Sequence, residues 1–257
     1  HKYDLLDYFH VSPNMGTGEE FRELVQDIHN RGMHIVIDGV FNHCSWYFPQ
    51  FSDVVEKGES SEYANWFYQL QFPVIRPATE EEKPTYSCFA YERKMPKLNS
   101  SNSEERAYFM EVCRYWIREF KVDGWRLDVA NEVDRGFWRD FHRAAHEENP
   151  ESVMIGEIWE SSETWLNGDM FDSTMNYDFR KNCRDFFALR KISTEEFHDR
   201  IVKMLLRYRT GTLRGQLNLL DSHDVNRFLS YCEGDLRRFR LAEVFLFTSP
   251  GIPCVFY

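Results

Sequence analysis

The sequence has no basic stripe and no apolar run long enough to cross a membrane. Of its 257 residues, 31 are Lys or Arg and 42 are Asp or Glu, which gives a net charge of -11. Nucleic-acid phosphates require a basic surface, so this balance argues against a nucleic-acid partner and favours a neutral or cationic small ligand. The most apolar stretch, residues 244–257, is interrupted by two prolines and a glycine. It is too short to span a bilayer, and no membrane partner is expected.

Paired cysteine motifs are also absent. The six cysteines form no CxxC pair, and several lie in apolar runs such as residues 110–116, which is typical of reduced, buried thiols. Because disulfides are rare in the cytoplasm, we predict a cytoplasmic location. No signal peptide is visible, and a chain that begins at His1 rather than at a methionine leads us to expect an upstream segment.

Two further classes of motif are missing. No GxGxxG follows a strand pattern, which disfavours a dinucleotide-binding open sheet. No HxH or HExxH spacing occurs, so the usual ligand patterns of a catalytic zinc ion have no counterpart in this chain.

Hydrophobic periodicity predicts helices and strands that alternate along the chain. Helices are expected over residues 17–32, 101–120, 135–146, 194–208 and 236–247, and strands over residues 34–41, 122–132, 153–159, 171–177, 216–220 and 253–257. Thr17 and Glu20, and likewise Ser193 and Glu196, have the spacing of a capping box at a helix start. This alternation predicts a parallel sheet covered by helices.

The predicted fold class is α/β, in the form of a (β/α)8 TIM barrel, because polar residues gather where the strands end, as they do at the active-site face of such barrels. Six strands are two fewer than a closed barrel needs, so we expect an incomplete barrel of about six βα units. Residues 44–99 have many aromatic residues but no clear periodicity. We therefore predict a first barrel part over 1–43, an inserted subdomain over 44–99 and the continued barrel over 100–257. A doubly wound open sheet is the alternative.

The stretch Val122–Glu132, VDGWRLDVANE, combines a strand pattern with buried charge. Alternation along a strand places Arg126 and Asp128 on the same face. Burying two charges costs free energy unless they stabilise each other or a ligand. A structural ion pair and a catalytic site are therefore the two interpretations of this stretch.

Polar side chains gather near the ends of three other predicted strands. They are Asp38, Asn42 and His43, then Glu157, and then His223 and Asp224. In a barrel these strand ends meet at one mouth. Two chemistries fit such a set, a metal-dependent barrel hydrolase and a glycosidase with paired carboxylates. Arg126 favours the glycosidase, because a guanidinium beside Asp128 repels a divalent cation and keeps the carboxylate ionised.

Four of these segments carry a family resemblance. DGVFNH (38–43), GWRLDVANE (124–132), GEIW (156–159) and LLDSHD (219–224) resemble, in order, the four signature regions of the α-amylase family of glycoside hydrolases. MPKLN (95–99) and the VANE that follows the aspartate resemble the subgroup of neopullulanases, cyclomaltodextrinases and maltogenic amylases. The resemblance covers essentially the whole chain.

The resemblance implies a role for each matching residue. Asp128 matches the catalytic nucleophile, Glu157 the general acid/base and Asp224 the carboxylate that stabilises the transition state. The implied substrate-binding residues are Tyr3, His43, Arg126, Asn131, Glu132, Trp159, His223 and Arg227. The apolar neighbours of Glu157 favour a protonated acid, which agrees with its implied role.

The implied activity is retaining hydrolysis of α-1,4 and also α-1,6 bonds in cyclomaltodextrins, pullulan or maltooligosaccharides, with transglycosylation as a second outcome. A non-catalytic carbohydrate-binding or structural member of the fold is the alternative, which the intact set of three carboxylates disfavours. No cofactor is expected to be required. Asn42 matches a structural calcium ligand of many α-amylases, but the subgroup commonly lacks that site, so no metal is predicted. A homodimer of the full-length protein is the assembly that the subgroup suggests.

Overall fold

The computed structural model describes residues 2–79 and 81–257 of the chain. It contains two compact units, His1–Met154 (unit 1) and Ile155–Tyr257 (unit 2). The boundary falls inside strand β3, Val153–Gly156.

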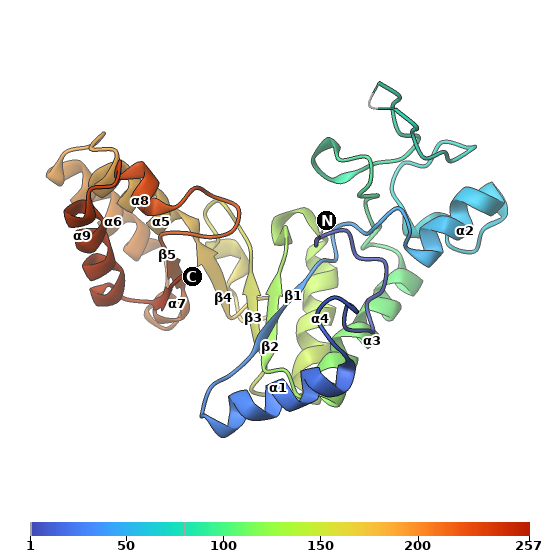
Figure 1. Cartoon of the computed structure of the whole chain (residues 1–257), viewed down its shortest axis with the longest axis horizontal. Coiled ribbons are helices and arrows are strands. Elements are labelled where there is room, and N and C mark those ends of the chain that lie inside the picture. The colour runs from blue at the N-terminus through green and yellow to red at the C-terminus, as the bar shows by residue number, and fades with distance from the viewer. Residues whose placement is uncertain (1, 80) are drawn as a thin grey trace. The chain divides into compact units, whose positions relative to one another are not determined.

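Unit 1 contains two complete parallel strands, a helix that precedes the first of them and helices that follow each of them. Figure 1 shows these elements. Its main elements are α1 (Gly18–Asn30), β1 (Val36–Gly39), α2 (Pro49–Lys57), α3 (Ser103–Phe120), β2 (Gly124–Leu127) and α4 (Arg135–Glu148). The predicted capping box is confirmed at the start of α1, where the Glu20 backbone N–H donates to the Thr17 hydroxyl and Glu20 accepts from the Thr17 backbone. Asn102 caps α3 in the same way by accepting from the first turn of the helix.

The register of the strands decides which side chains meet. β1 pairs in parallel with β2, and Asp38 lies opposite Arg126. The backbone N–H of Val153 donates to the carbonyl of Asp123 at 2.9 Å, so β3 begins beside β2. A Cβ on Gly124 would lie 2.2 Å from the Val153 carbonyl oxygen, which explains why glycine starts β2.

Aromatic side chains fill the core of unit 1. Phe41, two residues after the end of β1, packs on Phe109 of α3 and Phe141 of α4, with ring centroids 5.3 and 4.9 Å away. Figure 1 shows α3 and α4 side by side, and their buried faces meet around these rings. Tilted and edge-to-face aromatic pairs of this kind stabilise a core beyond their buried area. The end of β1 is thereby fixed against two helices.

Residues 44–79 and 81–99 form irregular structure around α2 and three short 3-10 turns. Isolated antiparallel bridges tie the segment together, among them His43 with Lys97. Phe51 contacts the rings of Phe67 and Tyr86 at 5.0 and 4.9 Å, so these aromatics fill the core of the segment itself. Its definition as an inserted subdomain stays a prediction.

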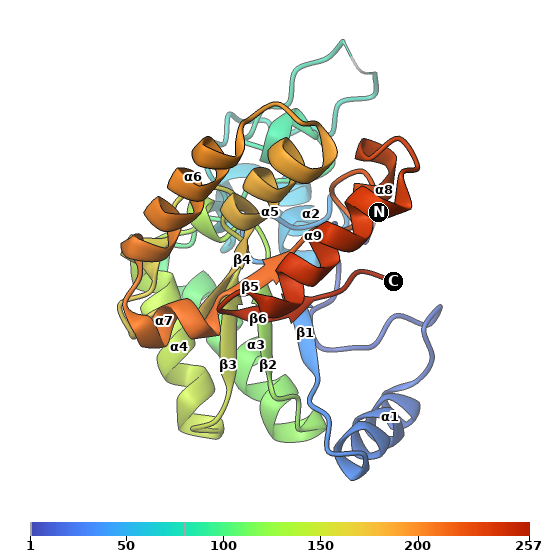
Figure 2. The same ribbon diagram turned by 90° about the vertical axis from the view of Figure 1, so that its left-hand side faces the viewer.

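Unit 2 continues the alternation of strands and helices. Its elements after β3 are β4 (Ser173–Asn176), α5 (Tyr177–Cys183), α6 (Thr194–Arg207), α7 (Thr210–Gly215), β5 (Leu217–Leu219), α8 (Phe228–Tyr231), α9 (Leu236–Thr248) and β6 (Ile252–Cys254). β3 pairs with β4, β4 with β5 and β5 with β6, all in parallel. Figure 2 shows α5 and α6 side by side. The predicted α/β class with parallel strands is confirmed.

Two predictions in unit 2 need correction. The last strand was expected over 253–257, but β6 spans Ile252–Cys254, and the carbonyl of Phe256 accepts from Arg227 beyond the end of the strand. The sequence also did not reveal α5, which runs directly on from β4 and continues as a π-turn over 184–188. The start of α5 is marked by Asn176, whose side chain accepts from the Phe179 backbone N–H, but this capping residue lies inside the predicted strand 171–177 and was missed.

The cysteine side chains agree with the prediction of reduced and mostly buried thiols. All six cysteines are free, and Cys44, Cys113, Cys183 and Cys232 are buried. Within the described residues, no helix has both the length and the apolar character needed to cross a membrane.

Candidate active site

Asp128 follows the last residue of β2 and is buried, with 6% of its surface exposed. Its backbone N–H donates to the Gly39 carbonyl at 2.9 Å, which extends the pairing of β1 and β2 by one residue. The strand then ends abruptly, since Val129 adopts a left-handed conformation with φ of 46°. A β-branched residue is strained there, so the backbone turn behind Asp128 is held by its surroundings.

Arg126 and Asp128 point the same way, as the alternation predicted. Arg126 Nη1 donates to Asp128 Oδ1 at 2.7 Å and to Asp38 Oδ1 at 2.9 Å. The Tyr3 hydroxyl donates to the other oxygen of Asp38 at 2.8 Å, and the guanidinium lies over the Tyr3 ring at 6.0 Å. One guanidinium therefore joins two carboxylates. Asp38 was expected among the polar residues at the strand ends but was assigned no role of its own, and its place opposite Arg126 in the register brings it into this cluster.

The charges of this cluster disfavour a metal ion. A cation already lies between Asp38 and Asp128, and a divalent ion at the same carboxylates would be repelled by it. Burial, the nearby charge of Asp38 and the hydrogen bond to it raise the pKa of Tyr3 well above its usual value. The Tyr3 hydroxyl thus stays protonated and acts as a donor.

His43 is fully buried, and its ring stacks on Phe89 with centroids 4.5 Å apart and planes 5° apart. Asn42 Nδ2 lies 3.3 Å from His43 Nδ1, which fits an amide donor and an imidazole acceptor. Burial lowers the pKa of His43 to about 4, although the backbone of Tyr3 opposes this shift. His43 is therefore a neutral imidazole near pH 7 and suits a polar contact to a sugar better than acid catalysis.

Asn42, the residue that matches a calcium ligand by sequence, is buried. Its Oδ1 is buried without a hydrogen-bond partner among the described residues, but calcium needs six to eight oxygen ligands.

The loop after Asp128 is tied to its surroundings at both ends. Trp138 of α4 donates its indole N–H to the Ala130 carbonyl at 2.8 Å. Glu132 forms an ion pair with Lys97 of the MPKLN segment at 2.8 Å. Asn131 and Glu132, two predicted substrate-binding residues, are exposed on this loop. The two segments that suggested the subgroup are thus in direct contact.

In unit 2, Glu157 follows the last residue of β3 and is 4% exposed. Trp159 donates its indole N–H to Glu157 Oε1 at 2.8 Å. The same indole stacks on Tyr177, with centroids 3.9 Å apart and planes 10° apart, while 49% of Trp159 remains exposed. A buried carboxyl group is therefore oriented by an aromatic pair that also presents an open ring face.

A second polar chain leads from this aromatic pair to Asp224. The Tyr177 hydroxyl lies 3.3 Å from the Ser222 hydroxyl, which accepts from the Asp224 backbone N–H at 3.3 Å. His223 Nε2 lies 3.3 Å from Asp224 Oδ2, and both side chains are partly exposed. Sequence reasoning did not select Tyr177 or Ser222, although each stands just after a strand or within the LLDSHD segment.

Arg227, also predicted to bind substrate, packs against the last residues of the chain. Its guanidinium lies 4.3 Å from the centre of the Phe256 ring and donates to the Phe256 carbonyl at 3.2 Å. It lies three residues after Asp224, at the residue that precedes α8.

The two units thus hold complementary chemical groups. Unit 1 presents a buried carboxylate beside a guanidinium, which suits a nucleophile that must stay ionised. Unit 2 presents a buried carboxyl with a neutral donor and a second, more exposed carboxyl. Retaining glycoside hydrolysis uses two catalytic carboxyl groups, an ionised one as the nucleophile and a protonatable one as the general acid/base.

Comparison with known proteins agrees with this chemistry. The family model described as the α-amylase catalytic domain matches residues 1–257. A cyclomaltodextrinase of Thermoanaerobacter pseudethanolicus is 44% identical over the whole chain, and so is an intracellular maltogenic amylase of Bacillus subtilis. The chain spans 44% and 42% of the length of these relatives. The solved structure of a cyclomaltodextrinase covers all of this chain and 44% of its own, with a TM-score of 0.96 at 42% identity.

These matches confirm the predicted TIM-barrel fold class and the resemblance on which the site was assigned. Enzymes of this type require no cofactor. The chain belongs to the α-amylase family of glycoside hydrolases.

Proposed function

We propose that this chain provides the catalytic residues of a retaining α-glucan hydrolase. The observation that carries the proposal is the bridge from Arg126 Nη1 to Asp128 and Asp38, which supports an ionised, oriented Asp128. In a retaining enzyme the two working carboxyl groups lie about 5 to 5.5 Å apart. We expect that separation between Asp128 and Glu157 when substrate is bound.

In the proposed reaction, Asp128 attacks the anomeric carbon while Glu157 donates its proton to the oxygen of the leaving sugar. The glycosidic bond breaks and an ester between the sugar and Asp128 forms. Glu157, now ionised, takes a proton from water, and the resulting hydroxide displaces Asp128. Asp224 stabilises the positive charge that develops on the sugar ring in both transition states.

The other predicted residues have supporting roles in this proposal. The neutral ring of His43 and the imidazole of His223 offer hydrogen bonds to sugar hydroxyls. Tyr3, held by Asp38, provides a face on which the sugar at the cleaved bond can stack. The half-exposed indole of Trp159 provides a second face beside the acid. Asn131, Glu132 and Arg227 are proposed as further contacts to the glucan.

The proposed substrates are cyclomaltodextrins and maltooligosaccharides with α-1,4 bonds, and pullulan with cleavage at α-1,4 or α-1,6 bonds. The names of the two curated relatives support the first two classes. Transglycosylation is proposed as a second outcome, in which a sugar hydroxyl replaces water in the second step. The free thiols and the intracellular relative support a cytoplasmic location, and we propose a homodimer for the full-length protein.

The test uses the full-length protein with β-cyclodextrin, pullulan and soluble starch in parallel. Release of reducing sugar is measured first, and NMR then follows the anomeric proton of the earliest product. We expect cleavage with the α-anomer formed first, and a first product in the β-form would exclude retention. Binding of cyclodextrin without cleavage would instead identify a non-catalytic member of the fold.

A further inference from the structure

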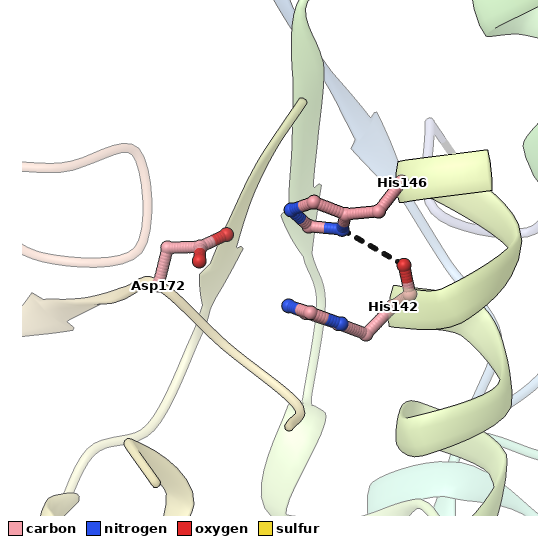
Figure 3. Close-up of side chains that lie close together, drawn as sticks. All are labelled: His142, His146 and Asp172. Carbon is pink, nitrogen blue, oxygen red and sulfur yellow. Dashed lines mark hydrogen bonds between the residues drawn. The ribbon is translucent and has the colours of Figure 1, made fainter. Parts of the chain in front are cut away.

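Two histidines one turn apart project from the same side of α4. His142 and His146 are separated by four residues, the spacing at which side chains on a helix become neighbours. Their rings stack with centroids 4.0 Å apart and planes 25° apart, and both are half-buried. Figure 3 shows the two rings projecting in parallel from the helix. Asp172, also drawn there, belongs to unit 2, whereas both histidines belong to unit 1.

The backbone fixes the tautomer of His146. Its Nδ1 lies 2.9 Å from the His142 carbonyl oxygen, marked by the dashed line in Figure 3. A carbonyl only accepts, so Nδ1 carries the proton and the lone pair of neutral His146 lies on Nε2. Metal-bound histidines commonly donate their second ring nitrogen to a backbone carbonyl in this way. The hydrogen bond therefore presets His146 as a metal ligand.

The distance between the two rings suits one metal ion. A ring nitrogen of His142 lies within 4.8 Å of a ring nitrogen of His146. Bonds of about 2.0 to 2.1 Å to each nitrogen require the two to approach within about 4.2 Å. A small rotation about the side-chain torsions closes the difference, and partly exposed rings have room for it.

The local charge also favours a cation. His146 lies in the last turn of α4, where unsatisfied carbonyl groups give the helix end a partial negative charge. The neighbouring cation Arg143 is paired with Asp140, and Arg114 of α3 is paired with Glu147. The acidic side chains of these pairs balance the nearby guanidinium groups.

We propose that His142 and His146 form a binding site for a divalent first-row transition-metal ion, with water completing its coordination. Imidazole pairs suit Zn²⁺, Ni²⁺ and Cu²⁺, and the order of affinity should place Cu²⁺ first. His146 lies eleven residues, or about 16 Å along the helix axis, from Arg135 at the start of α4. The site is thus separate from Asp128 and serves to bind an ion at the far end of the helix, without a part in the sugar chemistry.

The test is calorimetric titration of the chelator-treated full-length protein with Zn²⁺. His142→Ala and His146→Ala should each weaken Zn²⁺ binding by about tenfold or more. The double variant should bind Zn²⁺ no more weakly than either single variant, because the two ligands act as one unit. His198→Ala is the matched control, since His198 is exposed on α6 and has no histidine one turn away. It should leave Zn²⁺ binding unchanged.

A spectroscopic measurement distinguishes the pair from scattered surface histidines. The EPR spectrum of the Cu²⁺-loaded protein should show hyperfine splitting from two imidazole nitrogens, and either single variant should lose it. Equal Zn²⁺ affinity of wild-type protein and double variant, or an equal loss in His198→Ala, would overturn the proposal. Neither readout depends on turnover, so failure here leaves the proposed hydrolase function untouched.

Discussion

Trp159 donates its indole N–H to Glu157 Oε1 at 2.8 Å, a contact that the sequence did not predict. The indole is held in place by its stack on Tyr177. The orientation of the proposed acid therefore depends on an aromatic residue two positions further along the chain.

Trp159→Phe removes this donor and retains an aromatic ring that can stack on Tyr177. Because Glu157 acts as a neutral acid in this step and a neutral hydrogen bond contributes about 0.5 to 1.5 kcal/mol, we expect kcat/KM on maltooligosaccharides to fall about 2- to 10-fold. On α-maltosyl fluoride, whose leaving group needs no proton, the loss should be much smaller. An equal loss on both substrates would show that Trp159 acts through substrate stacking alone. Tyr177→Phe retains the stack and the indole donor but removes the hydroxyl that contacts Ser222, so it separates the effect of this donor from that of the polar chain to Asp224.

Arg126→Lys tests the bridge between Asp38 and Asp128. A lysine ammonium is a point charge on a flexible stem and cannot reproduce the planar geometry of the guanidinium. We expect kcat/KM to fall about 100-fold or more, with a thermal unfolding midpoint close to wild type. A lysine variant of normal activity would mean that the bridge does not orient the nucleophile.

The buried His43 should make the free energy of unfolding depend on pH. Its pKa is about 4 in the folded state and near 6.5 when unfolded, so the unfolded chain binds more protons between these values. The free energy of unfolding therefore falls by about 3 kcal/mol as pH is lowered from 6.5 towards 4, and this contribution is fully present above pH 6.5. His43→Gln has no such titration. Denaturant melts of both proteins from pH 7 to 4 should therefore show their stability difference changing by that amount, and a constant difference would contradict the burial argument.

Glu105 should destabilise the protein at neutral pH. Its side chain is fully buried near the start of α3, neither carboxyl oxygen has a hydrogen-bond partner among the described residues, and burial raises its pKa well above the usual value. The folded protein therefore holds the Glu105 proton more tightly than the unfolded chain does. This contributes to the free energy of unfolding below about pH 4.5, and the contribution is lost as pH rises through the pKa of the folded state.

Glu105→Leu should therefore stabilise the protein at pH 7 by about 1 to 3 kcal/mol, and the gain should shrink on acidification. The variant retains the backbone N–H that donates to Asn102 at the helix start. Glu105→Gln, which keeps a polar group in the same place, should gain less. A leucine variant that is less stable at pH 7 would show that the carboxyl group has a partner.

Chelation should leave hydrolysis unchanged, because a guanidinium already lies between the two carboxylates of unit 1. Dialysis of the full-length protein against a chelator, followed by cyclodextrin assays with and without added Zn²⁺, checks this. A large loss that Zn²⁺ reverses would support the metal-dependent alternative. Any metal held by His142 and His146 should be removed in the same experiment without effect on the rate.

Local patterns predicted much of the fold and part of the site. The capping box at Thr17 and Glu20 and the shared face of Arg126 and Asp128 follow from spacing within one helix or strand, so they could be inferred before any packing was known. The free cysteines likewise agree with their apolar surroundings.

The contacts of the candidate site that local patterns did not predict depend on how distant segments of the chain pair with one another. The bridge to Asp38 exists because β1 and β2 pair with that residue opposite Arg126, and a shift of one residue would turn it to the other face. The contact between Tyr177 and Ser222 joins segments 45 residues apart. The spacing of His142 and His146 is visible in the sequence, but the tautomer that suits a metal is fixed only by the helix geometry.

The most direct test of the account is the position of the covalent intermediate. The Glu157→Gln variant of the full-length protein is mixed briefly with α-maltosyl fluoride, denatured with acid, digested and analysed by mass spectrometry. The fluoride leaves without a proton donor, whereas hydrolysis of the intermediate is slow without the base, so the ester should accumulate. We predict a maltosyl adduct on Asp128 that disappears when Asp128→Asn is added. An adduct on a different residue, which persists in the double variant, would contradict the assignment of Asp128 as the nucleophile.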